Sequence, residues 1–142
     1  MVAKQLSVFI ENRKGRLGEV LEVLKKNNVN ILSLSLADTA EYGLLRLIVD
    51  EPEKGKEKLV EDGFSTMLTD VLVIKIRHES GSLQNFLSVI SARDISVEYM
   101  YGLSIDGEDA SVVLKTSDLK KALSVISENG IDTLSGEDIA KL

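Results

Sequence analysis

Hydrophobic and polar residues alternate with two different periods along the chain. Residues Gln5–Glu11 alternate every second position, which predicts a half-buried β-strand. The stretch Arg16–Lys26 then places its apolar residues at the i, i+3, i+4 and i+7 spacing of one helix face, at Leu17, Val20, Leu21 and Leu24. The chain therefore begins with a strand followed by an amphipathic helix.

The same reasoning extends through the first half of the chain. Two further strands are predicted at Ile31–Ala37 and Tyr42–Val49, joined by a short polar turn. A second helix begins at Pro52, because proline suits the first turn of a helix. It runs to about Asp62 and is expected to end at Gly63 in a left-handed cap, and a last strand follows. This half reads strand, helix, strand, strand, helix, strand.

The second half repeats the first at an offset of 66 positions. Leu6 falls on Leu72, Gly15 falls on Gly81, and the apolar helix face recurs at the same offset. The predicted elements are a strand Val71–Arg77, a helix Ser82–Arg93, strands Ser96–Ile105 and Ala110–Thr116, a helix Leu119–Glu128 capped by Asp118, and a short helical turn after Ser135. The order of elements matches the first half.

Two copies of βαββαβ predict an α+β fold class, with two ferredoxin-like units in tandem. We expect domain 1 at residues 1–69 and domain 2 at residues 70–142. No linker is visible between Phe64 and Arg77, so the units are expected to pair within the chain and hide their sheet edges.

The second strand of each copy departs from the repeat in the phase of its apolar residues. In the first copy the apolar side of the second strand is formed by Leu32, Leu34 and Leu36, whereas the second copy has Val97, Tyr99 and Tyr101, one residue out of phase. Since such a shift moves every side chain to the other face, either a bulge intervenes or the two sheets bury different faces.

Composition excludes several classes of function. The formal net charge is −6, which argues against sequence-independent nucleic-acid binding. The chain has no cysteine, so disulfides, thiolate nucleophiles and Cys-ligated metals are excluded, and the lone His78 cannot form a common catalytic zinc site. Carboxylate-only cation sites stay open. No segment is long enough for a membrane helix or typical of a signal peptide, so we expect a soluble, cytoplasmic protein without a cofactor.

Other functions of this fold lack their residues. RNA-recognition modules carry aromatic and basic residues on their central strands, and "SLSLAD" and "GLLRLIVD" have no aromatic residue. An acylphosphatase-type enzyme would need a glycine-rich phosphate cradle beside its arginine, and that cradle is absent. Gly15 and Gly18 do not have the spacing of a dinucleotide fingerprint. No residue is expected to be catalytic.

The loops after the first strands resemble the ACT-domain family. The stretches that carry the resemblance are "NRKGRL" and "NVNI" in the first half, with "ESGSL" and "DISV" in the second. More narrowly, "FIENRKGRLGEVLEVL" with "LADTAEYGLLRLIVD" resembles the stand-alone tandem ACT proteins of bacteria. The resemblance covers nearly the whole chain and implies two βαββαβ regulatory modules that bind an amino acid between paired domains. The proline that often precedes the loop glycine is replaced by Lys14 and Ser80, and His78 replaces the polar Asn12 in the second copy.

Residues of the first loop suit a zwitterionic amino acid. The amide of Asn12 can both donate and accept hydrogen bonds, and Gly15 lets a ligand approach the backbone. The free N–H groups around Arg16 and Leu17 at a helix start favour a carboxylate. Additional candidates are Asp38 and Thr39 for the ammonium group, Tyr99 and Tyr101 for a pocket wall, and Arg13 and Lys14 in the loop. The three basic side chains are expected to lie in solvent, with their backbone making any contact.

Each candidate also has a plain structural explanation, since glycines form turns, tyrosines pack and loop charges are solvated. The expected function is a non-catalytic sensor or regulator with a free amino acid as its ligand. No catalytic domain is visible in the sequence, so the regulated enzyme is expected to act in trans, and neither nucleic acid nor membrane is an expected partner. Dimerisation of the whole chain stays open. The alternatives are a ligand-free assembly module and a small acylphosphatase-type enzyme.

Overall fold

The computed structural model describes residues 2–11, 13–38 and 41–142, which form two compact units. The first unit comprises residues 4–69 together with 139–142, and the second comprises residues 70–138 together with Val2 and Ala3. In the described part of the chain, no helix has the length and apolar character needed to cross a lipid bilayer.

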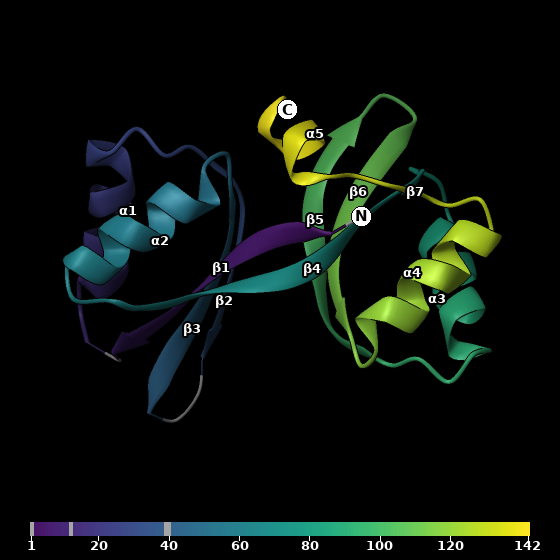
Figure 1. Cartoon of the computed structure of the whole chain (residues 1–142), viewed down its shortest axis with the longest axis horizontal. Helices are drawn as coiled ribbons and strands as arrows, with labels where there is room; N and C mark the ends of the chain where they lie inside the picture. The colour runs from purple at the N-terminus through teal and green to yellow at the C-terminus, as the bar shows by residue number, and fades with distance from the viewer. Residues whose placement is uncertain (1, 12, 39–40) are drawn as a thin grey trace. The chain divides into compact units, whose positions relative to one another are not determined.

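The first unit is an antiparallel sheet with two helices on one face. Its elements are β1 (Ala3–Glu11), α1 (Arg16–Lys26), β2 (Ile31–Asp38), β3 (Tyr42–Val49), α2 (Pro52–Glu61) and the first part of β4 (Ser65–Arg77). Strands β1 and β2 both pair with β3, and Figure 1 shows α1 and α2 on the same side of this sheet. As predicted, Pro52 begins α2, and Gly63 follows it in the left-handed region with φ 90°.

The second unit repeats this arrangement. It contains the rest of β4, followed by α3 (Ser82–Ser91), β5 (Val97–Asp106), β6 (Asp109–Thr116), α4 (Leu119–Glu128) and β7 (Asp132–Thr133); α5 (Gly136–Ala140) ends the chain's helices. Strands β4 and β5 pair with β6, and β7 pairs with β4.

The predicted cap of α4 is confirmed, because Asp118 Oδ1 accepts a hydrogen bond of 3.0 Å from the backbone N–H of Lys121.

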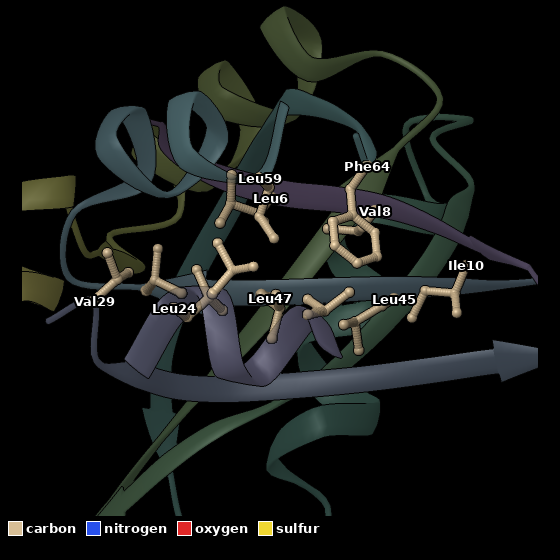
Figure 2. Packing of buried hydrophobic residues seen from close by; sticks show 12 residues of the cluster. Leu6, Val8, Ile10, Leu24, Val29, Leu45, Leu47, Leu59 and Phe64 are labelled. Atoms are coloured by element: carbon tan, nitrogen blue, oxygen red, sulfur yellow. The ribbon is translucent and has the colours of Figure 1, made fainter. Parts of the chain in front are cut away.

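A dense aliphatic core holds the first unit together. The sticks in Figure 2 come from β1, β3, both helices and the segments that follow the helices, where Val29 and Phe64 lie, with Ile10 at one end of the cluster. Helix α2 approaches the sheet so closely that a Cβ at Gly55 would lie 2.9 Å from Leu6 Cδ1. Because Leu6 is fully buried, any side chain at position 55 would force this core apart.

The predicted fold class is confirmed, with βαββαβ present twice. Some bounds differ from the sequence-based prediction by one or two residues, such as the end of α3 at Ser91 in place of Arg93. Two larger differences concern strands. The strand expected after Gly63 and the strand expected at Val71–Arg77 are one continuous strand, β4. The last strand of the second copy, β7, has only two residues.

The phase difference between the copies is explained by bulges. In β2 the residues Leu34 and Leu36 lie opposite core residues of β3, so they share the helix-bearing face of the sheet. In β5 the register shifts between Val97 and Tyr99, and this bulge brings Val97 and Met100 into contact with the same core. Both sheets therefore bury the helix-bearing face. Tyr101 lies opposite Val113, on the face away from the helices.

Candidate functional site

A cavity of about 350 Å³ lies at one end of the first unit. The end of β1, the loop before α1, the end of β2 and the start of β3 surround it. Aliphatic side chains of Ile10, Leu17 and Leu36 form part of its lining in the described part of the chain. Ligand sites commonly have about 300–1,000 Å³, so this cavity suits a small molecule.

Gly15 sets the shape of the loop on one side of the cavity. Its φ of 84° and ψ of −7° lie in the left-handed region, where residues other than glycine are strained. The turn is tight, since the Arg13 N–H donates to the Glu11 carbonyl at 2.7 Å and the Arg16 N–H donates to the Arg13 carbonyl at 3.3 Å. Helix α1 begins immediately after Gly15 and points its first N–H groups toward this loop.

Gly43 accounts for the hollow itself. On the helix-bearing face of β3, Leu47 and Leu45 fill the core, and Gly43 is the next residue on that face. Gly43 lies opposite Ile10 of β1 and Asp38 of β2. The row of β3 side chains formed by Leu47 and Leu45 therefore ends at Gly43, which has no side chain to continue it. The sequence analysis missed this residue, although a glycine inside a predicted strand is a known signal of close approach by a ligand or another backbone. Ile10 and Leu36 were missed as well, because they read as ordinary strand residues.

Ionisable groups lie on the exposed side of the cavity. Arg13 Nε lies 3.3 Å from Glu11 Oε2, and its Nη2 lies 3.7 Å from Glu19 Oε2. Asp38 at the end of β2 is exposed and also lines the cavity. A hydrogen bond from Arg16, followed by the charges of Arg13 and Arg16, lowers the pKa of Glu19 below its usual 4.5. Within the described residues, no three acidic or histidine side chains converge to hold a metal ion.

Arg16 is not the solvated side chain that the sequence analysis expected. Its guanidinium lies 3.9 Å from the centre of the Phe64 ring, and Nη1 donates to Glu19 Oε2 at 2.6 Å. Only 16% of the side chain is exposed, and Nε is buried without a hydrogen-bond partner in the described part of the chain. The stacking surface of Phe64 explains this burial, because an arginine can lie flat on an aromatic ring. The prediction that Arg16 lies in solvent was wrong.

The structure brings part of the predicted set of residues together. Arg13, Gly15, Leu17 and Asp38 line one cavity although they come from a loop, a helix and a strand. Lys14 is exposed beside it, as expected for a loop lysine. Tyr99 and Tyr101 belong to β5 of the second unit and are not among the described lining residues. Asn12 and Thr39 lie outside the described residues, so their predicted contacts stay predictions.

The corresponding loop of the second unit has the same backbone and different surroundings. Gly81 adopts φ 88° before α3, as Gly15 does before α1. The backbone N–H of the exposed His78 donates to the Glu108 carbonyl at 2.7 Å, and Arg77 pairs with the Glu108 carboxylate at 3.2 Å. Ala110 occupies the register position of Gly43, since it lies opposite Ile76 as Gly43 lies opposite Ile10. The second unit thus has a side chain at the position where Gly43 leaves space in the first unit.

Two copies of this βαββαβ unit, each with a glycine loop before its first helix, define a pair of ACT domains. The chain belongs to the ACT domain pair family, whose model matches residues 1–142. The predicted family is therefore confirmed, and the family indicates a regulatory role. No curated protein matches the sequence.

Solved structures show the same fold. Protein BT0572 from Bacteroides thetaiotaomicron is 41% identical with a TM-score of 0.94, and the match covers 100% of this chain and 98% of that one. The ligand-free regulatory subunit of aspartate kinase from Thermus thermophilus is 14% identical with a TM-score of 0.61, covering 88% and 91% of the two chains. The corresponding subunit from Thermus flavus is 13% identical with a TM-score of 0.58, covering 88% and 90%. The two kinase subunits share the fold alone.

Proposed function

We propose that this protein is a non-catalytic regulator that binds a free α-amino acid in the first-unit cavity. The observation that carries this proposal is the convergence of a cation, an anion and a helix start on one small cavity. Arg13 supplies a positive charge and Asp38 a negative one, and α1 begins directly after Gly15. An amino acid offers the complementary carboxylate and ammonium groups.

The balance of charges favours a zwitterion over a phosphate. At and beside the cavity there are three basic side chains, Arg13, Lys14 and Arg16, and three acidic ones, Glu11, Glu19 and Asp38. The basic groups are already engaged in part, since Arg13 and Arg16 both approach Glu19. A dianionic phosphate would face this nearly neutral set unfavourably, whereas a zwitterion adds no net charge.

We place the ligand at an interface between two ACT-like units, and the regulated partner in a separate protein. In support, the cavity reaches β2, which pairs only with β3 among the described strands and ends the strand order. Leu34 and Leu36 on this edge strand are 47% and 50% exposed, which leaves apolar surface for a second unit to cover. A ligand that binds the covered arrangement better would shift the population toward it.

A melting-temperature screen of the whole chain against the twenty amino acids tests the proposal. A ligand at about one hundred times its Kd adds ~2.7 kcal/mol to the free energy of unfolding. For a chain of this size we expect a rise of at least about 5 °C for the true ligand. Light scattering with and without that ligand would show whether the interface joins two copies of the chain.

The two alternative functions, a small acylphosphatase-type enzyme and a ligand-free assembly module, supply the controls for this screen. Inorganic phosphate and acetyl phosphate belong in the same screen, and turnover of the acyl phosphate would favour the enzyme alternative instead. No shift with any amino acid would contradict the proposal and leave the ligand-free assembly module.

A further inference from the structure

We infer that the first-unit cavity selects amino acids with aliphatic side chains. The inference rests on the proposed function and adds the chemistry of the ligand beyond its two charged groups. It is carried by the lining of the cavity and by the missing side chain of Gly43.

The lining separates into an apolar wall and a charged rim. Ile10 is 5% exposed and belongs to the core cluster, and Leu17 packs against the same cluster. Leu36 completes the wall from β2, with half of its surface still exposed. The three ionisable lining residues, Glu11, Arg13 and Asp38, are all exposed. A ligand that keeps its carboxylate and ammonium at this rim places its side chain against the aliphatic wall.

Covering Leu36 supplies a driving force that only an apolar side chain can use. Burial of apolar surface is favourable, and Leu36 is an apolar residue that the described part of the first unit leaves half uncovered. A charged or hydroxyl-bearing ligand side chain would instead lose its water against Ile10, Leu17 and Leu36, because none of these three side chains can donate or accept a hydrogen bond. The cavity therefore favours leucine, isoleucine or valine over aspartate, lysine or serine.

The missing side chain of Gly43 leaves the space that the ligand's side chain would occupy. A Cβ built on Gly43 would lie 3.6 Å from Leu36 Cδ1, 3.7 Å from the Ala37 carbonyl oxygen and 3.9 Å from the Ile10 carbonyl oxygen. These are ordinary contact distances, so a side chain at position 43 can be accommodated, and it would fill the space beside Leu36.

Calorimetric titration of the intact protein with leucine, isoleucine, valine, alanine, serine, aspartate, lysine and phenylalanine tests the inference. A methylene group in an apolar pocket discriminates roughly 10–200-fold, so the best branched aliphatic ligand should bind at least about tenfold more tightly than alanine. Tighter binding of serine, aspartate, lysine or phenylalanine would overturn the inference while the proposed function stands. If none of the twenty amino acids raised the melting temperature in the screen, both the proposed function and this inference would be overturned.

Two matched pairs of variants locate the effect. Leu36→Ser should weaken aliphatic binding about tenfold or more, whereas Val60→Ser, on helix α2 of the same unit with similar exposure, should leave it unchanged. Gly43→Val should fill the cavity and abolish binding, whereas Ala110→Val at the corresponding register position of the second unit should not. Both serine variants should fold, because Leu36 and Val60 are half exposed. Equal losses from Val60→Ser and Leu36→Ser, or unchanged binding in Gly43→Val, would overturn the inference.

Discussion

The two loops that connect the first strand of each unit to its first helix have nearly the same backbone. Gly15 and Gly81 adopt φ 84° and 88°, and a helix begins at the next residue in both. Their surroundings differ. The first loop borders a cavity beside Gly43, and the second has Ala110 at that register position and is tied to Glu108 through His78 and Arg77.

This difference shows that the glycine loop is a structural device shared by both copies. Its presence alone does not make a binding site, because the site depends on residues that neighbouring strands bring to it. At the register position of Asp38, opposite Gly43, the second copy has Ile105, opposite Ala110. The carboxylate of Asp38 and the missing side chain at Gly43 are therefore specific to the first unit. The second loop borders a different cavity of about 520 Å³, which Arg77, Glu79 and Ser82 help to line.

The largest expected effect is on ligand binding. Asp38→Asn removes the anion proposed to hold the ligand's ammonium group, and hydrogen bonds to charged groups contribute about 1.5–3 kcal/mol. We expect the Kd of the amino acid to rise roughly 10–150-fold in a calorimetric titration. Asp106→Asn in the hairpin of the second unit is the control, and an equal loss there would contradict the difference between the loops.

The next effect separates backbone geometry from ligand binding. Gly15→Val and Gly81→Val both place a β-branched residue in the left-handed region, and each should lower the free energy of unfolding by at least ~1–2 kcal/mol in urea denaturation. Only Gly15→Val should also reduce ligand binding. If Gly81→Val reduced it equally, the two loops would be functionally equivalent after all.

A smaller effect concerns the arginine that begins α1. Arg16→Ala removes the contact with Phe64 and the ion pair with Glu19, and a cation–π contact of this kind is worth about 0.5–2 kcal/mol. We expect a loss of about 1 kcal/mol in unfolding free energy. Ser82 begins the helix of the second copy, so Ser82→Ala is the matched control and should have little effect. Arg16→Lys should recover only part of the loss, because lysine lacks the planar group that stacks.

The smallest effect depends on pH. The pKa of Glu19 is lowered in the folded protein, so its stabilising contribution is present above pH 4.5 and is lost as the pH falls through the lowered pKa. Melting temperatures of the protein and of Glu19→Gln should therefore differ slightly at pH 7, and the difference should shrink as the pH falls below 4.5 through the lowered pKa. A difference that stays constant over this range would show that the charge of Glu19 is not involved.

The repeat, the order of elements and the glycine turns could all be predicted from the sequence. These features depend on local periodicity and backbone conformation, so Leu6, Gly15 and Asp118 indicate them without knowledge of distant contacts. Helix bounds at Arg16–Lys26 and Leu119–Glu128 were predicted to the residue. The family follows from the same local motifs.

The cavity was decided by tertiary structure alone. It exists because strand pairing places Gly43, which lies opposite Asp38 in the same hairpin, beside Ile10 of β1, which lies far from both along the chain. The burial of Arg16 likewise depends on Phe64, which lies between the end of α2 and the start of β4, far from Arg16 along the chain. Sequence patterns show which face a residue occupies within its own element, whereas the register between strands decides which side chains meet and where one is missing.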